Sequence, residues 1–211
     1  MYAQPAFRID TEASLAFAGA RGFGLAVAFD NGRPVASAVP FLLDPAEAPE
    51  RLQFHVARGN PLGALAEAGG TWLISVQGHD AYVSPDWYDS AEQVPTWLYE
   101  LVHLSGPVSV IPPGRLVTHL EKLSAKFEER LLPKKPWLLD KVSARRQDML
   151  MRAIVGIEMK IENVEGSFKL NQHKPEADYV GTARALVRQA DPSAVAIARR
   201  MMAVKPQLSY D

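Results

Sequence analysis

The feature that most constrains the fold is a series of short segments in the first half of the chain that read as β-strands. Residues 52–57 alternate between apolar and polar or small side chains, which is the period of a half-buried strand. Asp30-Asn31-Gly32 separates the apolar runs 23–29 and 33–43 and predicts a hairpin, because a tight turn needs residues that tolerate positive φ. Further strands are expected at 71–77, 80–83 and 98–111. Six strands with hairpin-like connections predict an antiparallel β-barrel rather than a parallel α/β sheet.

Helical signals lie between these strands and beyond Gly114. Asn60-Pro61 and Asp191-Pro192 each combine a capping side chain with proline at the first helical position, and they predict helices over 61–68 and 192–204. Apolar residues recur at helical spacing from Leu116 to Leu131. Other helices are expected at 10–18, 143–153 and 177–189.

The C-terminal half also contains strand signals. Residues 155–161 alternate clearly, and Glu165-Gly166 is expected to turn the chain into a strand at 168–170. The fold expected is mainly β with flanking helices and an α+β C-terminal extension. Its predicted parts are a barrel core (1–111), a helical pair with a β-hairpin that completes the barrel domain (112–182), and a helical tail (183–211).

The composition excludes several classes of function. The 211 residues include no cysteine, which excludes disulfides, thiolate catalysis and cysteine-ligated zinc and fits a reducing cytoplasm. The N-terminus has no basic stretch followed by an apolar run, so no signal peptide is expected. No segment approaches the roughly 20 apolar residues of a membrane helix. A soluble cytoplasmic protein with no membrane partner is therefore expected.

Charge is unevenly distributed along the chain. Residues 1–111 hold 5 basic and 12 acidic side chains, whereas residues 112–211 hold 18 and 12. A basic C-terminal half is compatible with an anionic partner such as DNA, and residues 114–152, with 10 basic side chains, form the candidate surface. Exposed helices also carry lysine and arginine for solubility alone, and the connector 132–137 does not fit a helix-turn-helix.

A candidate anion site lies at Arg58-Gly59-Asn60-Pro61. A helix N-terminus exposes N–H groups and a positive dipole end, and Arg58 would add a charge-assisted contact to a phosphate. The alternative is an ordinary capped helix beside a solvated arginine. The motif by itself does not decide between them.

The segment 79–106 is the candidate cofactor wall. It is rich in aromatic residues and prolines, which predicts a structured loop between two strands. Tyr82, Trp87 and Trp97 would supply flat faces for a planar cofactor. Hydrogen-bonding groups nearby are Gln77, Ser84 and Thr96. The alternative is a loop whose tryptophans simply cover the core.

No catalytic or metal-binding motif is present. The five histidines lack the i, i+4 spacing of a helical metal site, so no metal is expected. His55 and His103 lie on expected strands and would suit haem ligation or proton transfer, although structural histidines are commoner. Nucleophile-elbow, dinucleotide and P-loop signatures are all absent, and no catalytic residue is assigned.

Several motifs, taken in order, resemble the PaiB-type FMN-binding negative transcriptional regulators. They are Met1-Tyr2 with Pro5 and Phe7, Pro40-Phe41-Leu42-Leu43, the run 55–61, the run 78–88, Val94-Pro95-Thr96-Trp97, Ile154-Val155-Gly156-Ile157-Glu158, and Glu165-Gly166 with Phe168-Lys169-Leu170. They span the chain to about residue 182. Three positions depart from the pattern of the family: Leu98 replaces an asparagine, and the family run Lys-Leu-Ser-Gln-Asn is Lys169-Leu170-Asn171-Gln172-His173, which differs at Asn171 and His173.

The resemblance implies a dimeric split β-barrel with FMN held in the groove between two subunits. Carried onto this sequence, Arg58 and Asn60 would meet the phosphate, and Ser84, Trp87, Thr96 and Trp97 would lie near the flavin or the dimer seam. The function it implies is an FMN-binding homodimer that resembles negative transcriptional regulators. The alternatives are an FMN-dependent oxidoreductase of the pyridoxamine-phosphate-oxidase-like type, with His55 or Tyr82 aiding proton transfer, and a haem-binding or cofactor-free relative.

Overall fold

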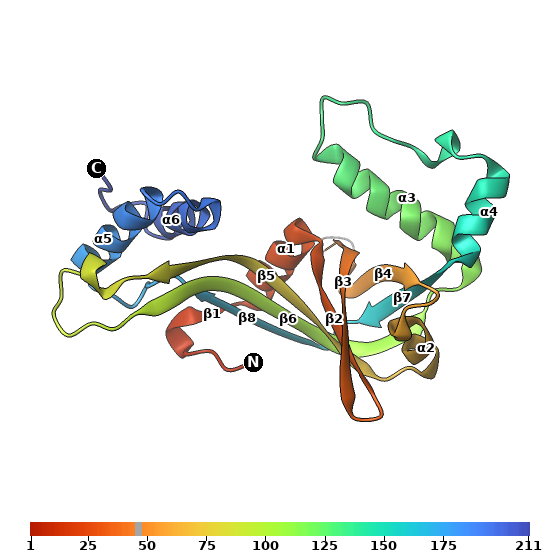
Figure 1. Ribbon diagram of the computed structural model, residues 1–211, viewed down its shortest axis with the longest axis horizontal. Helices are drawn as coiled ribbons and strands as arrows, with labels where there is room; N and C mark the ends of the chain where they lie inside the picture. Colours follow the sequence, from red (N-terminus) through yellow and green to blue (C-terminus); the bar gives the residue numbers. More distant parts are fainter. Residues whose placement is uncertain (45–47) are drawn as a thin grey trace. The chain divides into compact units, whose positions relative to one another are not determined.

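The computed structural model describes residues 1–44 and 48–211 and is built on one antiparallel sheet with flanking helices (Figure 1). The strands are β1 (Arg8–Ile9), β2 (Phe23–Asp30), β3 (Arg33–Asp44), β4 (Ala48–Ala57), β5 (Thr71–Val83), β6 (Thr96–Val110), β7 (Ile154–Lys160) and β8 (Asn163–Lys169). The α-helices are α1 (Thr11–Arg21), α2 (Pro61–Ala68), α3 (Pro113–Glu129), α4 (Ala144–Arg152), α5 (Glu176–Val187) and α6 (Pro192–Val204). Short 3-10 turns occupy Pro5–Phe7, Pro85–Trp87 and Leu139–Lys141. The loop expected over residues 44–50 lies partly outside the described residues.

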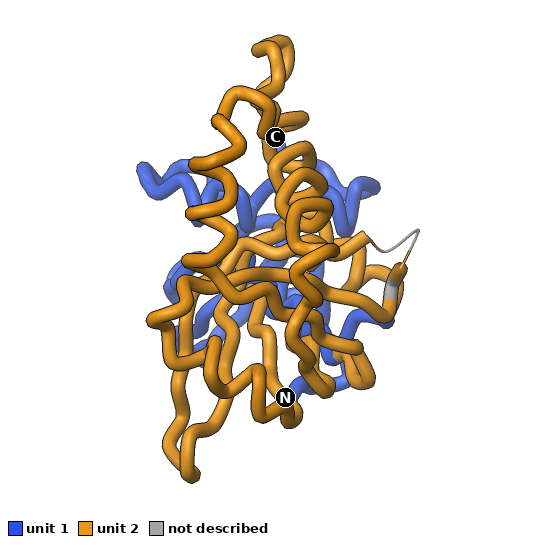
Figure 2. The backbone as a smooth tube through the Cα atoms, turned by 90° about the vertical axis from the view of Figure 1, so that its right-hand side faces the viewer, with its two compact units in different colours: residues 1–11, 77–102, 165–211 blue, residues 12–76, 103–164 orange. Residues whose placement is uncertain are grey.

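The chain comprises two compact units (Figure 2). One, here called the barrel unit, contains residues 12–76 and 103–164, and the other, the C-terminal unit, contains residues 1–11, 77–102 and 165–211. Strands β5 and β6 each contribute residues to both units. The units are therefore discontinuous in sequence. The division of the chain into domains at 111 and 182 stays a prediction.

The barrel unit is a closed antiparallel barrel. The hydrogen-bonded order runs β6-β5-β2-β3-β4-β7, and β7 returns to β6 through the pairs Val108↔Met159 and Val110↔Ile157. Strand β3 makes the corner, because its first part pairs with β2 and its last part pairs with β4 from Phe41↔Phe54 onward. The interior is apolar, with Phe41, Phe54 and Ile157 fully buried. The predicted barrel is confirmed.

Helix α3 lies on the barrel and is fastened to it at several points. Leu116, His119 and Leu123 form its buried face. Near its C-terminal end, Lys126 Nζ donates to the carbonyl of Leu43 at 3.2 Å, and Arg130 donates to the carbonyl of Ala20 at 2.5 Å. Helix α4, by contrast, buries none of its residues.

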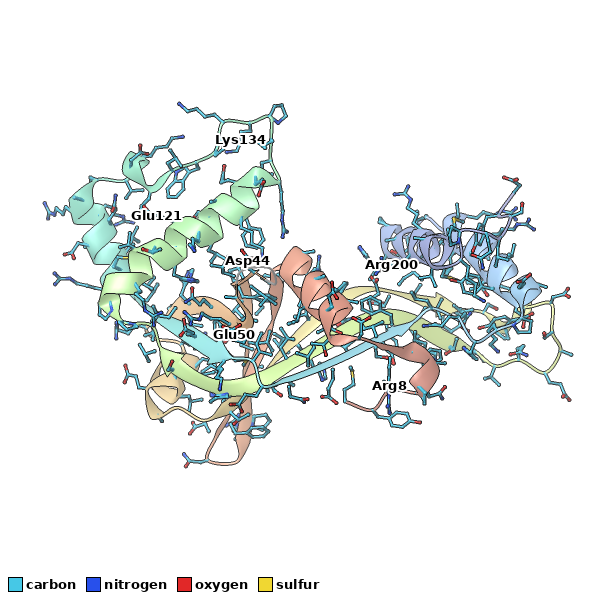
Figure 3. All side chains as sticks on the ribbon, turned by 180° about the vertical axis from the view of Figure 1, so that it is seen from behind. Arg8, Asp44, Glu50, Glu121, Lys134 and Arg200 are labelled. Carbon is cyan, nitrogen blue, oxygen red and sulfur yellow. The ribbon has the colours of Figure 1, made fainter. Side chains whose placement is uncertain are left out.

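The C-terminal unit places α5 and α6 against the strands β5, β6 and β8. The buried carboxylate of Glu100 on β6 pairs with Arg200 of α6 at 3.0 Å. Figure 3 labels Arg200. Ser193 of α6 exchanges two hydrogen bonds with the backbone of Asp80 on β5, at 3.0 and 2.8 Å. The helix α6 begins at Pro192 with the Asp191 side chain accepting from the Ser193 N–H, as predicted.

Local turn and cap signals were accurate. Asn31 and Gly32 have φ values of 48° and 80°, the positive values that the predicted hairpin requires. Helix α2 begins at Pro61, with the Asn60 side chain accepting from the Leu62 N–H. Both predictions are confirmed because they rest on contacts between residues close in sequence.

Two strand predictions were wrong. Residues 71–83 form the single strand β5 rather than two strands, since the four residues Gln77–Asp80 interrupt the alternation of burial without breaking the strand. The turn after β7 lies at Ile161-Glu162, so Glu165 and Gly166 sit inside β8. The loop expected at 79–106 is correspondingly shorter and covers residues 84–95.

Candidate functional site

Asn60 caps α2 in the barrel unit, and its side chain is fully used. Its Oδ1 accepts from the Leu62 N–H at 3.0 Å, and its Nδ2 donates to the Ser37 hydroxyl at 2.9 Å. The Gly63 N–H donates to the Asn60 carbonyl at 2.9 Å. Because Pro61 has no N–H, the first donors of this helix are satisfied within the chain.

Arg58 fastens the end of α4 to the start of β7. Its Nε donates to the carbonyl of Arg152 at 2.8 Å and its Nη2 to the carbonyl of Ile154 at 3.1 Å. Its backbone N–H donates to the carbonyl of Ala153 at 2.8 Å. Two guanidinium nitrogens of Arg58 therefore donate hydrogen bonds to backbone carbonyls. Contact between Arg58 and a phosphate remains a prediction.

His55 forms a pair with His119 that the sequence did not reveal. His55 lies on β4 and His119 on α3, with His55 Nδ1 and His119 Nε2 3.3 Å apart. Burial lowers the pKa of His119 to about 4, and the charge of His55 adds to this effect. Burial also lowers the pKa of His55. Both imidazoles are therefore neutral near pH 7, and one ring donates a hydrogen bond to the other.

Tyr82 and Trp97 form an exposed aromatic pair in the C-terminal unit. Their ring centroids are 6.0 Å apart at an interplanar angle of 69°, and their exposed fractions are 46% and 55%. They project from strands β5 and β6 on the face where neighbouring residues are also uncovered. An exposed tryptophan beside a tyrosine is the kind of surface on which a planar ligand stacks.

Thr96 points to the other face of the sheet, because successive strand residues alternate. Its hydroxyl accepts a hydrogen bond from Lys169 Nζ at 2.5 Å. Leu98 follows on this same face and is fully buried. Leu98, which replaces the asparagine of the family pattern, is thus a core residue. Thr96 and Trp97 cannot line one surface of a single subunit's sheet.

The remaining predicted residues serve local structure. The Ser84 hydroxyl accepts from the Asp86 N–H at 3.3 Å, and Gln77 donates to the Asp80 carboxylate at 3.0 Å. Trp87 lies in a 3-10 turn, and its own carbonyl oxygen would be 2.6 Å from a Cβ added at Gly181. That short distance explains the glycine, because α5 approaches this turn closely.

Sequence reasoning also did not identify a group of polar and charged residues near Lys169 as a candidate site. Lys169 is the last residue of β8, His173 and Lys174 lie a few residues beyond it, and Lys174 donates to the Gln93 side-chain oxygen at 2.5 Å. Asn171 is buried, has a φ of 59°, and donates to the Tyr88 hydroxyl at 3.1 Å. The only sequence signal was that residues 169–173 correspond to the run Lys-Leu-Ser-Gln-Asn of the PaiB-type family, from which they differ at Asn171 and His173.

A cavity of about 720 Å³ separates α3, the connector 130–143 and α4. Figure 1 shows the connector running away from the end of α3 and returning to the start of α4. The lining is mostly apolar and includes Leu120, Trp137, Leu150 and Met151. None of the eight residues predicted to contact a cofactor lines it.

Neither a metal site nor a membrane-spanning helix is found in residues 1–44 and 48–211. There, no three His, Cys, Asp or Glu side chains gather as a metal would require. Within the same ranges, no helix is both long and apolar enough to cross a bilayer.

Comparison with known proteins identifies the family. Residues 1–163 match the family described as "Putative FMN-binding domain". The chain belongs to this FMN-binding family. It is also 31% identical over 202 residues to the protein of Bacillus subtilis (strain 168) named protease synthase and sporulation protein PAI 2, an alignment that covers 95% of this chain and 96% of the relative. The PaiB-type resemblance is thereby confirmed.

Solved structures support the fold. The FAD and heme binding protein from Mycobacterium smegmatis superposes with a TM-score of 0.57 at 17% identity, covering 76% of this chain and 71% of that one. The flavocytochrome Anf3 from Azotobacter vinelandii gives 0.55 at 18% identity, covering 75% and 67%. Together with the barrel topology, these neighbours confirm the predicted split-barrel fold. Family membership supports FMN as the cofactor.

Proposed function

We propose that the chain acts in the cytoplasm as a homodimer that binds FMN non-covalently and regulates transcription or another cellular process. The match of residues 1–163 to the FMN-binding family carries this proposal. The extended similarity to the Bacillus subtilis relative supports the regulatory part. The flavin would serve as a sensed ligand or redox reporter.

The outer face of the β2–β3 ribbon supports a homodimer. Residues paired across an antiparallel ladder point to the same side of the sheet. On this side the paired residues are all apolar, and many are exposed: Phe23 with Pro40, Leu25 with Ala38, Val27 with Ala36, and Phe29 with Pro34. Phe29 is 66% exposed. A continuous exposed apolar ladder of this kind is typical of an interface, and a second copy of the chain would cover it.

Tyr82 and Trp97 are the best-placed contacts for the isoalloxazine ring. They are exposed, adjacent and rigidly held by two neighbouring strands. Burying their rings against a flavin would remove apolar surface from water and add stacking contacts. Thr96 lies on the face of the sheet opposite to Trp97. In a dimer it would therefore contact a ligand at a different place from Trp97.

The extension of α3 and α4 supports an anionic partner such as DNA. Helix α4 presents Arg145 and Arg146 to solvent and buries no residue. Figure 3 places Lys134 on the connector, which also carries Lys135. These side chains would contact phosphates of the DNA backbone rather than base edges.

One pair of measurements tests the proposal. Light scattering should give a dimer for the wild-type protein and a monomer for Leu25→Asp, because a buried unpaired carboxylate opposes association. FMN binding should be lost with the dimer. Val187→Asp on α5 is the matched control, since Val187 has the same 43% exposed fraction as Leu25. A wild-type monomer would contradict the homodimer, and turnover of reduced nicotinamide above the free-FMN background would favour the oxidoreductase alternative.

A further inference from the structure

Three half-buried lysines of the C-terminal unit each lie over an aromatic ring. Lys169 Nζ is 5.9 Å from the centroid of Phe7, Lys174 Nζ is 4.6 Å from Tyr88, and Lys205 Nζ is 4.4 Å from Tyr179. A ring face attracts an ammonium group and restrains it. These ammonium groups are therefore held near the protein surface rather than extended into water.

The charges of the three lysines all act on one imidazole, that of His173. The ring of His173 packs edge-on against Phe7 at 5.1 Å, beside the ring under Lys169. Burial lowers the pKa of His173, and the charges of Lys174, Lys169 and Lys205 lower it further. Burial and the charge of Lys174 also lower the pKa of Lys169. We call Lys169, Lys174 and Lys205 around His173 the lysine cluster.

No carboxylate neutralises the lysine cluster by direct contact in residues 1–44 and 48–211, where none of the three lysines forms an ion pair. Their hydrogen-bond partners are neutral: the Thr96 hydroxyl for Lys169 and the Gln93 amide oxygen for Lys174. The buried carboxylate of Asp178 attracts Lys174 without forming an ion pair with it, and one of its oxygens accepts from the N–H groups of Asp89 and Ser90, at 2.8 and 2.9 Å. This single negative charge offsets only part of the positive charge of the three lysines. Like charges held together in this way repel one another, and a bound anion would relieve the repulsion.

We propose that the lysine cluster binds a phosphate group, as inorganic phosphate or as a phosphate monoester. Each ammonium group can donate up to three hydrogen bonds, and phosphate oxygens accept several at once. Lys169 and Lys174, whose charges act on each other, would donate to such a group, and the positive charge of Lys205 would add to the attraction. The site uses neither Arg58, two of whose guanidinium nitrogens donate to backbone carbonyls, nor the N-terminus of α2, where the Asn60 side chain accepts from the Leu62 N–H.

The first test is a titration with inorganic phosphate at constant ionic strength, followed by calorimetry. The wild-type protein should show saturable binding. The double variant Lys169→Met/Lys174→Met should bind roughly tenfold more weakly or worse, because two charge-assisted contacts are lost. Lys160→Met/Arg188→Met removes two exposed positive charges elsewhere and should leave binding unchanged. Equal binding by the wild-type protein and the cluster variant, or no saturable binding by the wild-type protein, would overturn the proposal.

FMN and riboflavin distinguish the two sources of the phosphate. If the cluster holds the FMN phosphate, the wild-type protein should prefer FMN over riboflavin and the double variant should lose that preference. If it holds free phosphate, the preference should survive in the double variant while phosphate binding is lost. The inorganic-phosphate arm decides the proposal even for a protein that binds no flavin. Should circular dichroism show that the double variant is unfolded, Lys174→Met alone replaces it.

Discussion

His55 Nδ1 and His119 Nε2 lie 3.3 Å apart, and they join β4 to the buried face of α3. His119 is 2% exposed, and no hydrogen-bond partner of its Nδ1 is found in the described part of the chain. The pair therefore adds one neutral hydrogen bond to the contacts that hold α3 on the barrel. Protonation of both rings would place two positive charges side by side in the core, which makes this contact sensitive to acid.

We predict that the protein loses stability on acidification through His119. The folded pKa of about 4 lies below 6.5, the ordinary pKa of a histidine side chain, so the unfolded chain binds the proton first. The stabilisation is complete above pH 6.5 and declines toward pH 4, by about 3 kcal/mol in total. Urea unfolding between pH 7.5 and pH 4.5 should show a shallower pH dependence for His119→Leu than for the wild type. The exposed His79→Gln is the control, and an equal slope in all three proteins would contradict the prediction.

Gly106 should tolerate no side chain. A Cβ at this position of β6 would lie 1.8 Å from the carbonyl oxygen of Lys160, a backbone atom that cannot move aside. Gly106→Ala should therefore lower the free energy of unfolding by about 3 kcal/mol or more. At Gly114 in α3 a Cβ meets nothing within 4 Å, so Gly114→Ala should be neutral or stabilise by about 0.5 kcal/mol. Denaturant unfolding of both variants measures the difference.

Arg58 should matter to α4 more than to the cofactor. Its side chain holds the carbonyls of Arg152 and Ile154, so Arg58→Ala should cost about 1–2 kcal/mol of local stability. Hydrogen exchange of the amides near residues 150–154 should accelerate. A large fall in FMN affinity with unchanged exchange would instead support the phosphate contact that the sequence predicts.

DNA binding, if it occurs through α4, should depend steeply on salt. Replacing Arg145 and Arg146 with glutamine removes two exposed charges and should reduce the slope of log affinity against log salt by about 1–2. Gel shifts at low and moderate salt measure the slope. Absence of binding by the wild-type protein at low salt would refute the DNA-binding part of the proposal.

Local signals explain what could be predicted from the sequence. Asn60-Pro61 and Asp191-Pro192 set their helix starts through hydrogen bonds that span two residues, and Asn31-Gly32 set its hairpin through its own backbone angles. The alternation of residues 52–57 and 155–161 likewise reflects burial that each strand experiences along its own length. Element type and turn position follow from such signals.

The site depends on contacts between residues far apart in sequence, which no local pattern encodes. His55 and His119 are separated by 64 residues, and Thr96 and Lys169 by 73. The alternation of β5 changes over residues 77–80, where the strand passes from the barrel unit to the C-terminal unit. From the sequence alone, such a change of the burial pattern within one strand looks the same as a turn between two strands.

The most direct test of the central claim is an equilibrium titration of the cofactor-stripped protein with FMN, followed by flavin and tryptophan fluorescence. The account predicts saturable binding of one FMN per subunit, with quenching of the exposed Trp97 that disappears in Trp97→Leu. Absence of saturable binding would contradict an FMN-binding function for this chain and leave a barrel whose role lies with its partners.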